Sequence, residues 1–243
     1  MGFEFSKVFG PTDSVAGTKT TVGSTVVIPP GQHVIRKIRV SKGNVVNAKE
    51  CAGVITLEVT GVDGTYEYTY GNGTGGATNG GPGGPAEIIE CMVSAPGGST
   101  LTVSVTDAEA ATAVVVSLEF FTGSGRVDSY SAGGAGVDPA AATLKEVGTI
   151  TVTKAGRIKQ IRYACGQVVD AKSCSGKLEL KIPGLAGPFE FAVGNRASGA
   201  TLGGAALADV IDVDIPVGTN VIVTVNVTYT DATVSATVSL AVA

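Results

Sequence analysis

The chain has 243 residues, of which only 16% are charged, and its formal net charge is −4. Average globular proteins carry roughly 25% charged residues. The first half, 1–124, holds the whole excess of −4 and the second half, 125–243, is neutral, so neither half is the basic body expected of a nucleic-acid binder. No apolar run approaches the ~18 residues of a membrane span, and no basic, then apolar leader typical of a secretory signal opens the chain.

The mean hydropathy of +0.32 is high for a chain without a membrane span. A domain this poor in charge has little with which to solvate its surface. We therefore expect neighbouring copies of the chain to cover much of that surface. A compact monomer with small Ala, Gly and Thr side chains outside is the alternative.

Residues 1–19 are predicted to form an N-terminal arm that lies outside the rest of the fold. Its apolar side chains are Phe3, Phe5, Val8 and Phe9. Gly2 and Ser6 formally fit the short N-myristoylation pattern. We expect such an arm to bind a neighbouring subunit or a lipid surface.

The rest of the chain is an internal duplication. Residues 35–57 match residues 158–180 at eleven of twenty-three positions, and GNVVNAKECAG (43–53) returns as GQVVDAKSCSG (166–176). Each copy is about the size of one globular domain, far longer than a solenoid repeat. We place the first copy at 20–124 and the second at 147–243.

Both copies show the period-2 alternation of half-buried strands, punctuated by Gly, Pro, Asn and Asp. The first copy is predicted to hold eight strands, near 20–28, 33–41, 44–49, 54–60, 65–70, 86–94, 99–106 and 112–121. The second is predicted to hold the same eight, near 147–153, 157–164, 167–172, 177–183, 188–193, 208–215, 219–228 and 233–242.

Aromatic side chains mark the core-facing side of the fifth strand in each copy. Those of the first copy are Tyr66, Tyr68 and Tyr70, and those of the second are Phe189, Phe191 and Val193. Side chains two apart share a sheet face, so we expect this face to point into the sandwich. The fifth strand is followed in both copies by a long glycine-rich insertion, 71–85 and 194–208, which we expect at the surface.

Eight antiparallel strands in each copy fit a jelly roll, in which two four-stranded sheets each bury one face. An immunoglobulin-like sandwich is the alternative, but its core usually holds a Trp and this chain has none. The sequence therefore predicts an all-β fold of two tandem eight-stranded antiparallel jelly-roll sandwiches. Between them, 125–146 is predicted to be a linker with a short helix near 139–145, because Asp138 and Pro139 suit a helix start.

The four cysteines do not form a shared disulfide framework. Cys51 and Cys174 are equivalent, whereas Cys91 and Cys165 align with Val213 and Lys42. A Cys51–Cys91 bridge in the first copy remains open; small buried thiols are the alternative.

Few residues suggest catalysis or metal binding. His33 is the only histidine, and we expect it to be solvated beside a turn, so histidine-based catalysis and a clustered-His metal site have no candidates. Asp209, Asp212 and Asp214 suggest a cation site, but a solvent or interface face suits them, and their counterparts Glu87 and Glu90, at least as well. We predict no enzyme activity and no catalytic, cofactor-binding or metal-binding residues.

A basic group recurs on the second strand of each copy. Its members are Arg36, Lys37 and Arg39 in the first copy and Arg157, Lys159 and Arg162 in the second. Because their neighbours are Ile and Val, they are expected on the outer sheet face. They would pair there with acidic residues of the adjoining sandwich or subunit, or lie in solvent.

Two tandem eight-stranded units without a catalytic set resemble the double jelly-roll major capsid proteins of tailless icosahedral viruses with an internal membrane. The resemblance covers nearly all of 20–243 and rests on architecture rather than on a motif. It implies a homotrimer that forms a pseudo-hexameric capsomer, and a closed virion shell tiled by such capsomers and assembled in the host cytoplasm. It also implies contacts with other capsid proteins, and with the membrane through the arm, and no sequence-specific binding of nucleic acid.

Two other functions remain open from the residues. An extracellular filament or surface-layer subunit would complete its sandwich with a strand donated by a neighbour, so one copy should lack a strand. A jelly-roll glycan-binding module would stack sugars on exposed aromatic rings.

Overall fold

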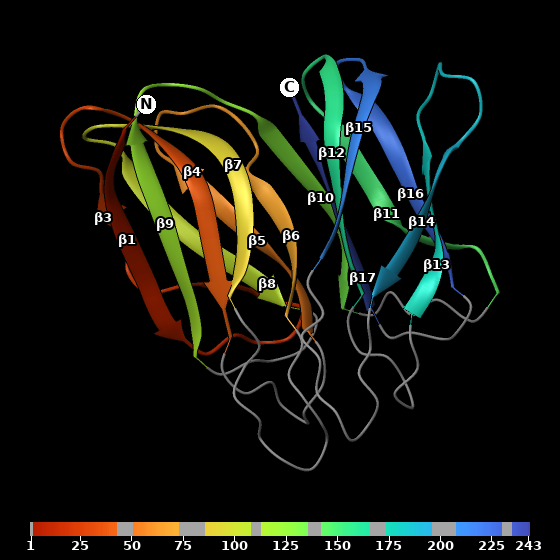
Figure 1. Ribbon diagram of the computed structural model, residues 1–243, viewed down its shortest axis with the longest axis horizontal. Coiled ribbons are helices and arrows are strands. Elements are labelled where there is room, and N and C mark those ends of the chain that lie inside the picture. The colour runs from red at the N-terminus through yellow and green to blue at the C-terminus, as the bar shows by residue number, and fades with distance from the viewer. Residues whose placement is uncertain are drawn as a thin grey trace, which may run out of the picture.

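The structure is a computed structural model that describes residues 2–42, 51–72, 86–107, 113–135, 142–165, 174–195, 208–229 and 235–243. Over these ranges the chain is built of strands, and it forms two β-sandwiches that lie side by side (Figure 1). No helix occurs among the described residues.

The first sandwich contains nine strands in two sheets. They are β1 (Phe3–Thr12), β2 (Lys19–Thr21), β3 (Val26–Val27), β4 (Gln32–Ser41), β5 (Cys51–Val59), β6 (Glu67–Asn72), β7 (Glu87–Pro96), β8 (Thr100–Asp107) and β9 (Val114–Thr122). One sheet has the order β1-β9-β4-β7 and the other β2-β8-β5-β6, with β3 continuing β2 along β8. The predicted strand 20–28 is thus divided into two short strands.

The second sandwich repeats this arrangement with eight strands. They are β10 (Asp128–Ala135), β11 (Lys145–Val152), β12 (Gly156–Cys165), β13 (Cys174–Lys181), β14 (Phe189–Asn195), β15 (Asp209–Val217), β16 (Val221–Tyr229) and β17 (Ser235–Val242). The sheet orders are β10-β17-β12-β15 and β11-β16-β13-β14. Each strand occupies the position of its counterpart in the first sandwich.

This strand order is that of a jelly roll, in which successive strands mostly change sheet and the first and last strands pair. The ladders between neighbouring strands are antiparallel in both sandwiches. The predicted double jelly roll is therefore confirmed.

Each sandwich has its own apolar core between its two sheets. Tyr66, Tyr68 and Tyr70 are 2%, 3% and 0% exposed and belong to the first core. Val193 is buried in the second core, and Phe189 and Phe191 pack against it. The predicted inward face of the fifth strand is confirmed in both copies.

The predicted N-terminal arm is wrong, because its residues form an integral strand. β1 pairs along its length with β9, and the Phe9 side chain, 2% exposed, lies in the first core. Phe5 stacks on Phe120 with ring centroids 4.4 Å apart. Phe5 and Phe9 therefore face inward from the first strand of the jelly roll, whereas Phe3 and Val8 stay exposed.

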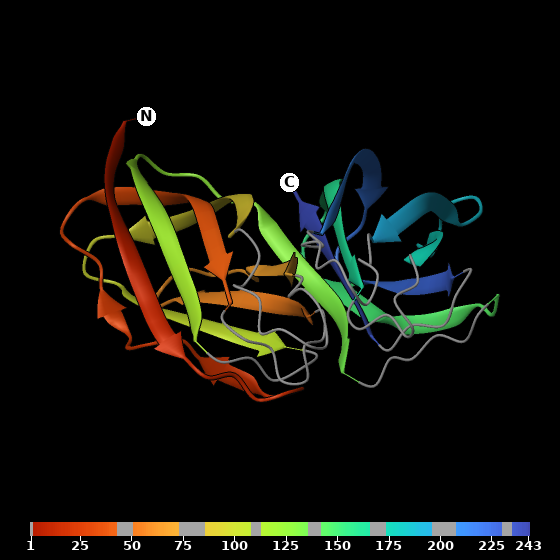
Figure 2. The same cartoon turned by 60° about the horizontal axis from the view of Figure 1, so that its bottom comes forward.

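The predicted linker is also wrong, because its first part is the equivalent strand of the second sandwich. β10 pairs with β17 in continuous register from Asp128 to Ala135, and it lies where the two sandwiches meet (Figure 2). Gly133 permits this pairing, since it has φ +97° and a Cβ there would lie 2.1 Å from the carbonyl oxygen of Ala236.

Several other predictions concern residues outside the described ranges. The strands near 44–49 and 167–172 and most of the glycine-rich insertions fall there. The helix expected near 139–145 lies partly outside as well; residues 142–144 form a turn and coil, and Lys145 begins β11. Among the described residues, β1 and β10 bring each sandwich to its full strand order.

If β1 is part of the first core, shortening its buried side chain will destabilise the protein. Phe9→Ala should lower the free energy of unfolding by about 3–5 kcal/mol, as expected for a buried Phe, whereas Lys7→Ala, at an exposed position of the same strand, should change it by less than about 0.5 kcal/mol. Denaturant unfolding measures both. Equal stability of the two variants would show that β1 is not part of the core.

Candidate functional site

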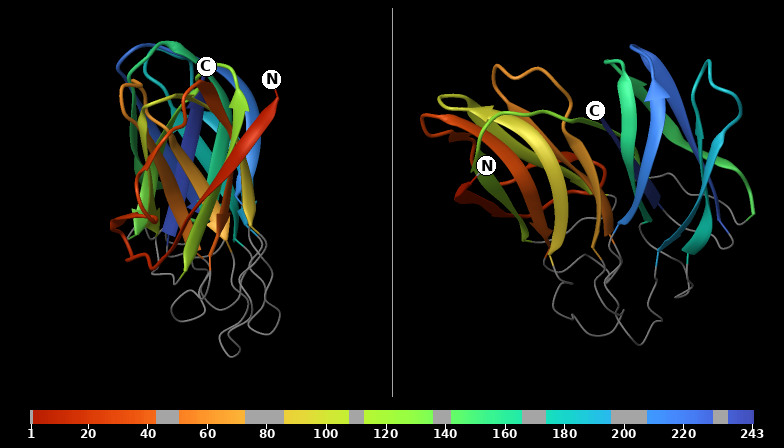
Figure 3. Two further views of the ribbon diagram at one scale, coloured as in Figure 1. Left: turned by 90° about the vertical axis from the view of Figure 1, so that its left-hand side faces the viewer. Right: turned by 45° about the horizontal axis from the view of Figure 1, so that its top comes forward.

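The described residues contain one extensive contact surface between parts of the chain, the junction between the sandwiches. Strand β6 is the edge of its sheet, and it lies against the outer face of the sheet formed by β10, β17 and β12. The right-hand view of Figure 3 shows the two sandwiches meeting along this line, with the C-terminus beside it. We refer to this surface as the junction.

The outer face of β17 allows β6 to approach closely because its side chains are small. Alternate residues of β17, among them Val238 and Leu240, point into the second core. The residues between them are Ser235, Thr237, Ser239 and Ala241. Thr237 and Ser239 are each 1% exposed although they point away from their own core, so the first sandwich covers them.

Groups of the second sandwich, mostly side chains, satisfy the free backbone edge of β6 and of the residues just before it. The Thr69 amide donates to Ser239 Oγ at 2.8 Å, and the Thr69 carbonyl accepts from Arg162 Nε at 2.9 Å. Ser129 Oγ donates to the Glu67 carbonyl, and the Ser129 amide donates to the Thr65 carbonyl at 2.8 Å. A sheet edge would otherwise expose these groups to pairing with another chain.

A buried ion pair connects the two sandwiches next to this edge. Arg162 Nη2 on β12 contacts Glu87 Oε1 on β7, and both side chains are more than nine-tenths buried. Glu87 Oε2 accepts from the Gly71 amide at 2.8 Å and from the Ala208 amide at 3.4 Å. Burial raises the pKa of Glu87, and Arg162 and the two amides lower it in part. Burial likewise lowers the pKa of Arg162 against the opposing effect of Glu87.

The predicted pairing of the basic strand with an adjoining sandwich is therefore confirmed for Arg162. Four of the other basic residues pair within their own sheets. Arg157 and Lys159 contact Asp214 at 2.6 and 2.5 Å, Lys37 contacts Glu90 at 3.6 Å, and Arg39 contacts Glu119 at 2.9 Å. Arg39, the counterpart of Arg162, keeps 42% of its side chain exposed.

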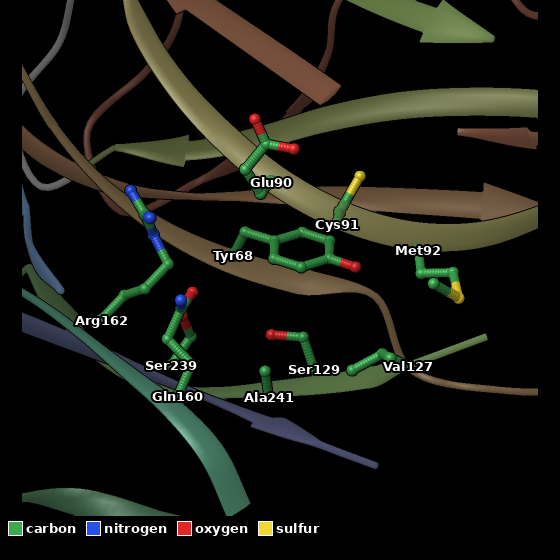
Figure 4. A pocket seen from close by; sticks show the side chains of 10 residues that line it. All are labelled: Tyr68, Glu90, Cys91, Met92, Val127, Ser129, Gln160, Arg162, Ser239 and Ala241. Atoms are coloured by element: carbon green, nitrogen blue, oxygen red, sulfur yellow. The ribbon is translucent and has the colours of Figure 1, made fainter. Parts of the chain in front are cut away.

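A cavity of about 210 Å³ opens beside the junction. Cys91 and Met92 of β7 line one side, Arg162 and Ser239 the other, and Tyr68 and Ser129 lie between them (Figure 4). The Tyr68 hydroxyl is buried and has no hydrogen-bond partner among the described groups, and burial raises its pKa. Most of the wall area is apolar, although Glu90, Gln160 and Arg162 also line the cavity.

Cys91 is a free thiol, so the Cys51–Cys91 bridge left open by the sequence is not formed. Its Sγ donates to the Ile35 carbonyl at 3.4 Å, and burial raises its pKa well above the usual value of a thiol. The side chains of Cys51, Cys165 and Cys174 are outside the described part of the structure.

The expectation of a solvated His33 is wrong. His33 lies in β4, is 6% exposed, and contacts Glu4 of β1 through Nδ1 and the Pro29 carbonyl through Nε2, the latter at 3.1 Å. Strand β1 covers this side chain, and no sequence pattern indicated that a strand would lie there. The ring thus fastens β1 to the first sandwich.

The three aspartates of β15 are engaged by neighbouring groups. Arg157 and Lys159 lower the pKa of Asp214, Asp212 accepts from Gln160 at 3.2 Å, and Asp209 accepts from the Gly194 amide at 2.7 Å. Within the described ranges no group of three or more His, Cys, Asp or Glu side chains is placed to hold a metal ion. Nor do these ranges include a helix suited to crossing a membrane.

Comparisons with known proteins add little beyond the fold. No protein-family model matches the chain, and no curated protein matches it. Among solved structures, the chain is similar to one from the atomic structure of Sulfolobus turreted icosahedral virus, with 12% sequence identity and a TM-score of 0.45 over 98% of this chain and 89% of that chain. Both values are low, and the class of the protein, a double jelly roll, rests on its own strand order.

Removing the buried cation of the junction should destabilise the protein strongly. Arg162→Ala leaves Glu87 buried without its charged partner, which typically costs about 3–5 kcal/mol. Lys159→Ala, on the exposed part of the same strand, should leave the free energy of unfolding nearly unchanged, because Arg157 still pairs with Asp214. Denaturant unfolding distinguishes them; similar values for both variants would contradict the role given to Arg162.

The Cys91 thiol should resist alkylation while the protein is folded. At pH 8 iodoacetamide should leave most of Cys91 unmodified in the native protein, since a partly buried thiol with a raised pKa stays protonated and is a poor nucleophile. It should modify Cys91 fully in denaturant without any reductant. Peptide mass spectrometry measures the modification in both states. If Cys91 stayed unmodified in denaturant, it would be part of a disulfide, and its assignment as a free thiol would be contradicted.

Proposed function

We propose that this protein is a structural major capsid protein. In this proposal three chains associate, and their six sandwiches form a pseudo-hexameric capsomer that tiles an icosahedral virion shell. Assembly takes place in the host cytoplasm, and the chain acts as a building block and not as an enzyme. The resemblance of the architecture to double jelly-roll capsid proteins suggests this class of protein. The geometry of the junction supports the proposed contact between chains.

The observation that carries the proposal is that each half of the junction has an unused counterpart at the opposite end of the chain. Arg162 lies opposite Ser239 across β12 and β17, and Arg39 lies opposite Ser117 across β4 and β9. The face that receives an edge strand in the second sandwich therefore exists, with the same Arg and Ser, in the first.

The edge strand has a counterpart as well. In the junction Glu87 accepts from the Gly71 amide at 2.8 Å, and at the far end Asp209 accepts from the Gly194 amide at 2.7 Å. Strand β14 is the free edge of its sheet, as β6 is of its own. Burial already raises the pKa of Asp209, and a second copy would supply its Arg39 to that carboxylate.

Exposed apolar side chains occupy the same two regions. Phe3 and Val8 on β1 are 59% and 58% exposed, and Val210, next to Asp209, is 48% exposed. Large apolar groups that remain exposed in one chain favour burial against another. A contact between β14 and β15 of one chain and β1, β4 and β9 of the next would cover them and repeat the junction.

This contact is head-to-tail, because it joins different surfaces of identical chains. A head-to-tail contact forms a ring if the rotation closes and a filament if it does not. The resemblance implies closure with three chains. It also implies that further capsid proteins and an internal membrane contact the shell.

The alternatives differ from the capsid proposal in features of the chain. A subunit completed by a donated strand should lack a strand, and each sandwich here has the full jelly-roll order from its own residues. A glycan-binding module needs exposed rings, and Tyr66, Tyr68 and Tyr70 lie in the core.

The mass of the purified protein in solution tests the proposal. Light scattering should give three times 24.2 kDa, or closed shells at higher concentration. Thin fibres would support the filament subunit, and a stable monomer that binds an oligosaccharide would support the glycan-binding module. Either result would overturn the capsid proposal.

Two single-residue variants test where neighbouring chains contact each other. Arg39→Ala and Asp209→Asn should each weaken trimer formation at least tenfold, because each truncates one partner of a charge pair that the contact buries. Lys19→Ala is the matched control, since Lys19 forms an exposed pair with Glu58 away from both surfaces, and it should leave the trimer intact. A trimer unaffected by the first two variants would require a different interface.

A further inference from the structure

A second buried ion pair lies inside the first sandwich, away from the junction. Lys42 Nζ, just after β4, is 2.6 Å from Asp107 Oδ1 at the end of β8, and both side chains are fully buried. The two strands belong to different sheets, so this pair connects the two layers of the sandwich.

Other groups fix the orientation of the Asp107 carboxyl group. Ser14 Oγ donates to Oδ2 at 2.5 Å, and Tyr70 donates through its hydroxyl to Oδ1. The Tyr70 ring also lies under Lys42, with Nζ 4.4 Å from its centroid. Gly53 provides the space, since a Cβ at that position would be 2.5 Å from Asp107 Oδ1. The amine nitrogen thus lies at the carboxyl group with both oxygens held by hydroxyl donors.

We propose that Lys42 and Asp107 condense to an intramolecular isopeptide bond. The reaction starts with transfer of one proton from the Lys42 ammonium to the Asp107 carboxylate, which gives a neutral amine and a carboxylic acid. The Nζ lone pair attacks Cγ and forms the C–N bond. The C–Oδ2 bond then breaks, and Oδ2 leaves as water with its own proton and one from Nζ. The products are one amide and one water, with no oxidant or cofactor required.

Three physical factors favour this step inside the protein. Burial away from water raises the free energy of the charged pair relative to the neutral amine and carboxylic acid. It therefore lowers the free-energy cost of the first proton transfer. A held pair of reactants has an effective concentration of about 10⁵–10⁸ M, which overcomes the preference for hydrolysis in bulk water. The Tyr70 hydroxyl donates to the oxygen that becomes negative during attack, and Ser14 donates to the oxygen that leaves.

The second sandwich lacks these groups, which makes the bond a property of one copy. Lys42 aligns with Cys165, and Tyr70 aligns with Val193. Asp107 pairs with Gly53 in the sheet, and the residue that pairs with the equivalent Gly176 is Tyr229. The pair therefore arose, or persisted, in the first sandwich alone.

The intact mass of the purified full-length protein tests this proposal. After incubation of the folded protein at neutral pH, the mass should fall below the sequence mass by one water molecule. Proteolysis should yield a branched peptide joining the Lys42 and Asp107 segments. A mass equal to that of the sequence, or a water loss located elsewhere, would overturn the proposal.

Variants separate this bond from other dehydration. The Asp63-Gly64 step of the chain can also lose water, by succinimide formation. Lys42→Arg leaves that reaction possible and keeps a buried cation, but it removes the reactive amine. This variant should show no water loss at Asp107. Tyr70→Phe should slow formation of the branched peptide several-fold without abolishing it. In Asp107→Asn the same attack would release ammonia instead of water, so the mass loss would change accordingly.

Discussion

The arrangement of the two sandwiches depends on how the edge of strand β6 is satisfied. A jelly roll leaves edge strands at the sides of its sheets, and the amide and carbonyl groups along such an edge need partners when they are removed from water. Here Ser239, Ser129 and Arg162 supply them from the face of the neighbouring sheet. Side chains provide most of these bonds, and the backbones of the two sandwiches pair only in an isolated bridge between Tyr66 and Ser129. The two sandwiches therefore meet without merging into one sheet.

The same requirement explains the composition of the receiving face. Long side chains on β17 would keep β6 at a distance, so the outward positions are Ser, Thr and Ala. These positions need no charge, because the first sandwich covers them. Contact between the two sandwiches of one molecule thus explains part of the low charge of the chain. In the proposed assembly, the counterparts of the junction on β4 and β9 and on β14 would be further surface covered by neighbouring chains.

The duplication allowed the sequence to predict most strands and one important contact. Matching residues placed β4 and β12 in register, and alternation with Ile and Val put Arg162 on the outer face. The sequence did not reveal β1 and β10 as equivalents, because FEFSKVFG and DSYSAGGA share almost no residues. The Gly and Ala residues of β10 are typical of a linker, and only pairing with β17 shows that they form a strand.

The residues that complete the junction also carry no signal in the sequence. A serine that binds a backbone edge, such as Ser239, does not differ in composition from a serine in solvent. The environment of His33 was likewise misjudged for lack of tertiary context, since β1 covers this side chain. Each of these errors concerns a residue whose environment comes from a distant part of the chain.

Tandem duplication has a consequence for assembly that separate sandwiches would not share. When two sandwiches are covalently joined, their mutual contact forms at a high effective concentration, so the junction can evolve as a buried interface without depending on protein concentration. The outer surfaces, inherited from the same ancestor, keep the elements of that contact in weaker, more exposed form: Arg39 is half exposed where Arg162 is buried, and Asp209 replaces Glu87. A strong contact within the chain and a weaker related contact between chains would give each subunit a fixed shape before assembly, and would leave the contact between subunits reversible enough for errors to be corrected while a closed particle forms.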